Sequence, residues 1–185
     1  MNITLYGAAS DRIDRVYIER VEELGRAMAR RGHTMVFGAG STGLMGAAAR
    51  GMAAEGGHII GVTPHFMHTL EPVSSLCTEL IATDTMAERK NIMEEKADAF
   101  VIVPGGIGTF DEFFQILTLK VLGRHNKPII LYNINGFWDN MIAVIGTDLF
   151  KGFINTHTAN CFCICETPES VFHEIEAPDD ENDNE

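Results

Sequence analysis

Short apolar runs alternate along this chain with longer segments that carry a helical repeat. In the first such segment, Tyr17, Val21, Leu24 and Met28 recur at spacings of three or four residues, which marks one face of a helix. The apolar runs predict strands at residues 2–6, 33–37, 58–63, 79–83, 99–103, 128–133 and 161–165. The repeating segments predict helices near residues 14–31, 85–97, 110–123, 137–149 and 168–175, and a further helix after the glycine loop at 38–46.

The alternation of strands and helices indicates the fold class. Strands that are almost wholly apolar belong in a parallel sheet covered on both faces, because each crossover helix must bury one side against the sheet. We therefore expect an α/β fold, a three-layer, doubly wound parallel sheet of Rossmann-like type. Residues 1–176 are predicted to form one nucleotide-binding domain, and residues 177–185 an acidic, disordered tail.

The charge of the chain is concentrated at its end. The formal net charge is -12, but nine of the 26 acidic residues follow Cys165, so the body carries 17 acids against 14 bases. A weakly acidic body without a Lys/Arg cluster argues against nucleic acid as a partner. Neither a secretion signal nor a run of 18 apolar residues is visible, so we expect a cytoplasmic protein that does not enter a membrane.

Three cysteines, Cys161, Cys163 and Cys165, occupy alternate positions of the last predicted strand. Strand alternation would place their sulfur atoms on one face of the sheet. Structural zinc sites prefer the spacing C-x2-C, so we interpret these residues as reduced core cysteines and expect no metal.

The first glycine loop, GAGSTGLMG at residues 38–46, matches G-x-G-x-x-G through Gly38, Gly40 and Gly43. A dinucleotide site would also need an acidic residue at the end of the next strand, which here ends in Val62 and Thr63. NAD is therefore not expected. A tight turn and a contact with phosphate or ribose remain equally good interpretations of this loop.

The second glycine loop, PGGIGTFDE at residues 104–112, follows a strand and leads into a helix. Its glycines allow backbone N–H groups to fold inward, and Thr109 can cap the helix, so the loop is typical of a phosphate cradle. No G-K-[ST] follows, and triphosphate hydrolysis is not supported.

Two charged side chains near this loop can be explained structurally or functionally. Glu112 fits a capping box with Thr109, in which the glutamate would bond only the backbone. Arg89 interrupts the apolar stripe of Met86, Met93 and Ala97 on the helix at 85–97, so it needs an anionic partner. That partner could be Glu112 or a bound phosphate.

At this point the residues match a known family. PGGIGTFDE resembles the P-G-G-x-G-T-x-x-E signature, and MAERK at residues 86–90 the M-x-x-R-K signature, of the Lonely Guy-type phosphoribohydrolases, long mislabelled as possible lysine decarboxylases. The resemblance runs from about residue 3 to residue 155. One departure is Ala39, where the family usually has glycine.

The resemblance implies an enzyme that hydrolyses the N-glycosidic bond of a nucleoside 5′-monophosphate, AMP or a cytokinin riboside 5′-monophosphate, without a metal or other cofactor. It assigns catalysis to Arg89 and Glu112. It assigns substrate binding to the remaining signature and loop residues, Gly40, Ser41, Thr42, Gly43, Met86, Lys90, Gly105, Gly106, Gly108 and Thr109.

A homodimer is also expected. The segment FDEFFQILTLKVL at residues 110–122 is apolar on nearly every side, so one face needs a partner besides the sheet, and the family implies the same.

Two other functions are weighed against hydrolysis. Molybdenum-cofactor carrier proteins are similar in fold and glycine loops, and they bind a phosphorylated ligand without cleaving it. A carrier, however, has no need to keep Arg89 and Glu112 together. A pyridoxal-phosphate lysine decarboxylase would need a buried lysine, and Lys90 is the only one near these motifs.

Overall fold

The computed structural model describes residues 1–146, 153–154 and 156–177. Its strands form a seven-stranded parallel sheet in the order β4-β3-β2-β1-β5-β6-β7. The predicted doubly wound α/β fold is confirmed. The strands are β1 (Asn2–Tyr6), β2 (Thr34–Phe37), β3 (Ile59–Pro64), β4 (Glu79–Thr83), β5 (Ala99–Ile102), β6 (Ile129–Tyr132) and β7 (Cys163–Cys165).

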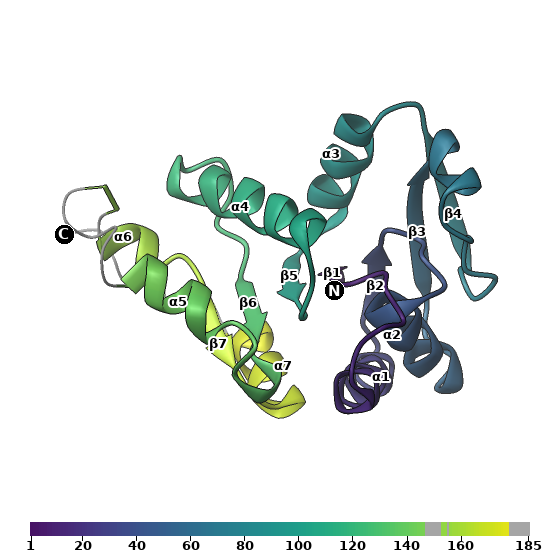
Figure 1. Ribbon diagram of the computed structural model, residues 1–185, viewed down its shortest axis with the longest axis horizontal. Helices are drawn as coiled ribbons and strands as arrows, with labels where there is room; N and C mark the ends of the chain where they lie inside the picture. The colour runs from purple at the N-terminus through teal and green to yellow at the C-terminus, as the bar shows by residue number, and fades with distance from the viewer. Residues whose placement is uncertain (147–152, 155, 178–185) are drawn as a thin grey trace.

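Helices cover both faces of this sheet (Figure 1). The first face carries α1, α2 and α7. The opposite face carries α3 and α4. The described helices are α1 (Arg15–Arg30), α2 (Gly43–Ala54), α3 (Met86–Lys96), α4 (Ile107–Val121), α5 (Asp139–Gly146), α6 (Thr156–Ala159) and α7 (Pro168–Glu176), with short 3-10 turns η1 (His65–Thr69) and η2 (Ile134–Gly136).

Alternate residues of each central strand enter different cores. In β1, Ile3 and Leu5 pack against α1 and α2, whereas Tyr6 packs on the other face with Phe100 of β5. These side chains are at most 2% exposed. Burying an apolar side chain of this size is worth about 1.5–3 kcal/mol, so both faces stabilise the central strands.

Close packing of α1 on α2 depends on glycine. A Cβ atom on Gly25 would collide with the carbonyl oxygen of Ala48, and one on Gly51 with that of Glu22. The two helices therefore approach each other with backbone against backbone at these points.

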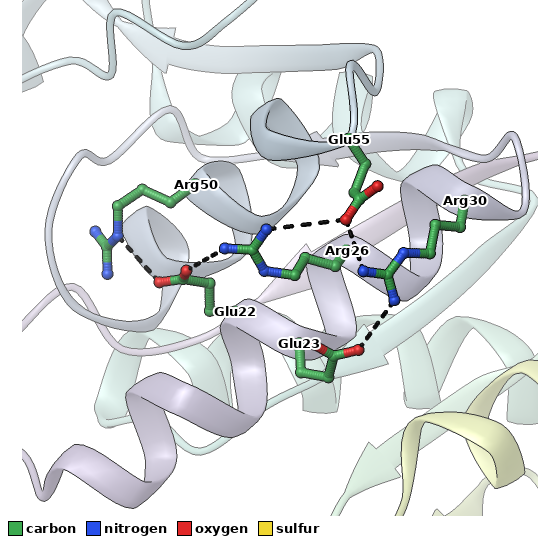
Figure 2. Close-up of polar contacts among 6 residues, drawn as sticks. All are labelled: Glu22, Glu23, Arg26, Arg30, Arg50 and Glu55. Carbon is green, nitrogen blue, oxygen red and sulfur yellow. Dashed lines mark hydrogen bonds and ion pairs between the residues drawn. The ribbon is translucent and has the colours of Figure 1, made fainter.

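Ion pairs cross the outer side of this helix pair (Figure 2). Glu22 lies between Arg26 and Arg50, at 2.9 and 3.4 Å, and Glu55 lies 2.7 Å from Arg30. These side chains are 28% to 53% exposed, where each pair contributes at most about 1 kcal/mol. Apolar packing and the glycine contacts therefore dominate this interface.

The strand order identifies the part of the sheet edge where folds of this kind bind ligands. The chain winds outward from β1 to β4, then returns to the other side of β1 as β5, so its direction reverses between β1 and β5. Open parallel sheets bind ligands outside the carboxyl ends of the strands at such a reversal. The loops after β1 and β5 both lie there.

Most predicted elements agree with the structure to within a few residues, and the helix expected near 110–123 runs from Ile107 to Val121. The interpretation of the three cysteines as core residues on one face of the sheet is wrong, since Cys163 is exposed. Cys161 does not share a face with Cys165, because β7 begins only at Cys163, and the two cysteines are buried in opposite cores. Residues 147–149 of one predicted helix, and residues 178–185 of the predicted tail, lie outside the described residues.

No helix within the described ranges is long and apolar enough to cross a membrane.

Candidate functional site

A cavity of about 360 Å³ opens at the carboxyl ends of β1 and β5. It brings together segments that are far apart in the sequence: the loop after β1, η1 with the residues after it, and the beginnings of α2, α3 and α4. Its walls are formed by Gly7, Ala8, Ala9, Ser10, Met45, Met67, Glu71, Met86, Arg89, Gly106, Gly108, Thr109 and Glu112.

The first turn of α4 forms one wall. Gly106 is the N-cap residue, so the N–H groups of Ile107, Gly108 and Thr109 have no acceptor within the helix. A Cβ atom at Gly106 or Gly108 would meet nothing within 4 Å in the part of the chain that the structure describes, and both residues are exposed. This helix start is open to an anion, and the helix dipole favours one there.

The predicted cap at Thr109 is wrong. Because α4 begins at Ile107, Thr109 lies inside the first turn, 3% exposed, with its side chain packed against Gly105. The capping-box interpretation of Glu112 fails with it. Glu112 is free to point into the cavity, where its partner is Arg89.

Arg89 and Glu112 form an ion pair between α3 and α4. Arg89 Nη1 lies 3.5 Å from Glu112 Oε1, and the two side chains are 10% and 11% exposed. Arg89 Nε also donates a hydrogen bond to the carbonyl oxygen of Val62 in β3, 3.1 Å away. This second bond fixes the guanidinium from the sheet, so Arg89 holds the carboxylate in a set position.

Burial controls the protonation of Glu112. Desolvation raises the pKa of this carboxyl to about 7, although the Arg89 charge opposes the shift, and neighbouring Asp111 adds to it. The pKa of Tyr6 is also raised, first by burial and then by the charge of Glu112. A carboxyl with a pKa near neutral, in a cavity, is a common property of catalytic groups.

Gly38 makes room for the arginine. A Cβ atom at this position would collide with Arg89 Nη2. At Gly38, therefore, glycine is needed for close packing against Arg89, as the interpretation of this loop as a tight turn expects. The next residue, Ala39, has φ 63°, a left-handed conformation that favours glycine and explains why glycine is usual there.

Residues 40–43 of the first loop support the cavity without lining it. Thr42 Oγ1 donates to the carbonyl oxygen of Ala9 at 2.6 Å, and Gly43 N donates to Asp11 Oδ1 at 2.8 Å. Both bonds tie this loop to the loop after β1, which does line the cavity. The four residues concerned, Gly40, Ser41, Thr42 and Gly43, are absent from its described walls.

Only some residues of the MAERK signature line the cavity. Met86 does, together with Arg89, whereas Met93, one turn further along α3, is buried in the core. Lys90 Nζ lies 2.9 Å from Asp111 Oδ2, and this pair braces α3 against α4 outside the cavity walls. Gly105 likewise lies behind the first turn of α4, against Thr109.

Glu71 was missed by the sequence analysis. It lines the cavity from the loop after η1, and its Oε1 atom is buried without a hydrogen-bond partner among the described residues. The signal was weak but present, because Glu71 is the only formally charged residue between Glu55 and Glu79.

Among the residues that the structure describes, no group of three or more His, Cys, Asp or Glu side chains could hold a metal ion.

Comparison with known proteins agrees with these features. Residues 45–175 match the family model described as "Possible lysine decarboxylase". The chain is 42% identical to the cytokinin riboside 5′-monophosphate phosphoribohydrolase of Mycobacterium tuberculosis over 138 residues, 75% of this chain and 74% of that protein. It is 35% identical to the enzyme of the same name from Rhodococcoides fascians over 178 residues, 96% of this chain and 90% of that protein.

The fold also resembles that of a carrier protein. The structure of the molybdenum cofactor carrier protein from Chlamydomonas reinhardtii superposes with a TM-score of 0.73 at 22% identity, covering 95% of each chain. A likeness at this identity concerns the fold alone.

Proposed function

Since this chain belongs to the Lonely Guy-type phosphoribohydrolases, hydrolases that act on N-glycosyl bonds, we propose that it cleaves AMP or a cytokinin riboside 5′-monophosphate to free base and ribose 5-phosphate. The relatives from Mycobacterium tuberculosis and Rhodococcoides fascians are named for the cytokinin substrate. Which base is preferred, adenine or prenylated adenine, is the more specific question within this proposal.

One observation carries the proposal: the Arg89–Glu112 ion pair and the open helix start of α4 share one cavity. A nucleoside 5′-monophosphate has an anion at one end and a cleavable bond on the far side of its sugar. The phosphate would accept hydrogen bonds from the N–H groups of Ile107, Gly108 and Thr109. Glu112 lies one turn further along the same helix, which suits the ribose.

Glu112 would act on the transition state. Cleavage of an N-glycosidic bond builds positive charge on the ribose ring, so a fixed carboxylate beside the ring stabilises the transition state more than the ground state. A contribution of about 2.7 kcal/mol corresponds to a hundredfold in rate, an ordinary scale for one such group. The ionised form is required, and its population rises as the pH passes about 7.

Arg89 would orient Glu112, and its positive charge would favour the ionised form of the Glu112 carboxyl. Its hydrogen bond to Val62 leaves Nη1 directed at the carboxylate, and a phosphate bound at the adjacent wall of Gly106 and Gly108 would lie nearby. A pure carrier of a phosphorylated ligand would gain nothing from this buried pair, which supports hydrolysis over carriage.

We further propose a homodimer formed through α3 and α4. Phe114 is 43% exposed, and it lies in an open groove of about 570 Å³ between these helices, with Asn91, Gln115 and Leu119. Leu122, at the end of α4, is 65% exposed. Light scattering coupled to size-exclusion chromatography tests this arrangement: a monomer mass at micromolar concentration would contradict it.

A substrate panel tests the function. Purified protein is incubated with AMP, prenylated AMP, other purine and pyrimidine monophosphates, and adenosine, and released base is separated by chromatography. We expect base release from AMP or prenylated AMP, and much less from adenosine, which cannot occupy the α4 start. No base release from any monophosphate would refute the proposal.

A further inference from the structure

A second cavity, of about 250 Å³, adjoins the candidate site at the start of α4. Ala8, Ser10 and Gly106 line both this cavity and the ion-pair cavity, which holds Arg89 and Glu112. The loop after β1 and the residues that lead into α4 therefore form the boundary between the two spaces. The proposed mechanism uses the ion-pair cavity and leaves the second one without a role.

The walls of this second cavity, the apolar cavity, carry no charged side chain. Besides the three shared residues and Gly105, they consist of Ile13, Tyr17, Leu44, Pro104 and Phe137. The rings of Tyr17 and Phe137 meet edge to face with their centroids 6.2 Å apart, and Phe137 is still 39% exposed. Apolar walls of this kind gain by covering an apolar ligand group, whereas a charged group would lose its hydration there without a partner.

The size and the few polar groups of the apolar cavity limit what can occupy it. An apolar cavity of about 150 Å³ is large enough for benzene, so about 250 Å³ has room for a chain of about six carbons. The side chains offer a polar ligand only the hydroxyl groups of Ser10 and Tyr17. Ser10 Oγ already accepts a hydrogen bond from the backbone N–H of Arg12 at 3.2 Å. A short hydrocarbon group therefore fits this space better than the polar edge of a nucleotide base.

The start of α4 supplies an anchor beside the apolar cavity. In the proposed function, the N–H groups of Ile107, Gly108 and Thr109 donate hydrogen bonds to a phosphate. A phosphate monoester has one esterified oxygen and three free ones. The free oxygens can accept these hydrogen bonds while the ester oxygen is directed toward either cavity. In AMP it would lead into the ion-pair cavity, and in a simple alkyl phosphate it would lead into the apolar cavity.

We propose that the start of α4 and the apolar cavity together bind monophosphate esters of short alkyl chains, of about four to six carbons. This inference rests on the phosphate position in the proposed function and adds a second class of ligand to the same anion site. An alkyl phosphate has no N-glycosidic bond and is not cleaved. Because it occupies the N–H groups that AMP needs, it inhibits base release competitively.

A series of straight-chain alkyl phosphates tests the proposal. Binding of methyl, butyl, hexyl and decyl phosphate to the purified protein is measured by isothermal titration calorimetry, with and without an excess of inorganic phosphate. We expect the affinity to rise about two- to fourfold per added carbon up to hexyl phosphate, because each buried methylene leaves water, and to level off before decyl phosphate. Inorganic phosphate should weaken the binding of every ester, since it competes for the start of α4.

Ile13→Asn separates the apolar cavity from the phosphate site. Ile13 is half-buried between β1 and α1, and of the two cavities it lines the apolar one. The affinity for hexyl phosphate should fall about tenfold or more, because the chain would have to desolvate an amide. The affinity for methyl phosphate and the rate of base release from AMP should not change. Val16→Asn, at a 37% exposed position of α1 outside both described linings, is the matched control and should bind both esters as the wild type does.

The other outcomes distinguish this inference from the proposed function. Affinity that is independent of chain length, or no binding of any ester, would overturn the inference even if AMP is cleaved. So would an affinity that continues to rise up to decyl phosphate or that Ile13→Asn leaves unchanged, because the chain would then lie outside the apolar cavity. Binding that depends on chain length and is weakened by phosphate, without base release from AMP, would refute the proposed function alone. Should Ile13→Asn fail to fold, the wild-type series decides.

Discussion

Arg89 Nη1 lies 3.5 Å from Glu112 Oε1 inside a cavity, with each side chain only about a tenth exposed. The pair joins α3 to α4, and its arginine is also bonded to β3 through the carbonyl oxygen of Val62. Stability and the proposed chemistry therefore depend on the same two side chains.

The first prediction concerns the coupling of this pair. Arg89→Met leaves Glu112 buried without its cation, which typically costs about 3–5 kcal/mol. Adding Glu112→Gln removes the stranded charge, so the double variant should be more stable than Arg89→Met alone. Urea unfolding of the four members of the cycle measures the coupling, expected at about 1–3 kcal/mol. Additive effects would show that the two groups do not interact.

The second prediction tests whether Arg89 needs the space left by the missing side chain of Gly38. Gly38→Ala should displace the guanidinium of Arg89, because the new Cβ atom collides with Nη2. We expect base release from AMP to fall at least about tenfold, since a misplaced catalytic group costs one to two orders of magnitude. Gly146→Ala, where a Cβ atom meets nothing within 4 Å among the described residues, is the matched control and should keep full activity. Equal activity in both variants would contradict the account of Gly38.

The pKa of Glu112 predicts a pH dependence of stability. Its folded-state pKa, about 7, lies above its ordinary value of 4.5, so the folded protein binds the proton more tightly. Stability from this group is therefore fully present below pH 4.5 and is lost as the pH rises through about 7. Relative to wild type, Glu112→Gln should gain about 2–3 kcal/mol in unfolding free energy between pH 5 and pH 8.

Denaturant unfolding of wild type and Glu112→Gln at both pH values checks this trend. Glu95→Gln, on the exposed side of α3, is the control and should follow the wild type. A constant difference between Glu112→Gln and wild type across this range would mean that Glu112 is not desolvated in the folded protein.

A fourth prediction concerns the α1–α2 interface. Gly25→Ala forces a methyl group against the carbonyl oxygen of Ala48, where rigid backbone cannot yield easily. Overpacking of this kind costs about 1–3 kcal/mol, despite the better helix propensity of alanine. Thermal unfolding should show a lower midpoint, with base release per folded molecule unchanged. An unchanged or raised midpoint would contradict the close approach.

The sheet was predictable because its strands are buried on both faces. Runs such as AFVIV and PIILYN must be apolar at every position, and this makes them visible without tertiary information. That the two glycine loops follow strands could also be predicted, whereas the strand order with its reversal beside β1 was visible only in the structure.

Predictions from local sequence motifs were wrong where the same residues are compatible with two different local conformations. TFDE at residues 109–112 matches a capping box, but Gly106 can also adopt the extended N-cap conformation, and α4 begins there instead. The earlier start turns Glu112 from a cap into a cavity residue. Glu71 lies in a loop without periodicity, so only its isolated charge distinguished it.

The most direct test of the central claim is base release from AMP by wild type and Glu112→Gln, compared at pH 8 with both proteins shown to be folded by circular dichroism. The account predicts adenine and ribose 5-phosphate from the wild type and about a hundredfold lower kcat in the variant. Equal turnover by the two proteins would contradict it.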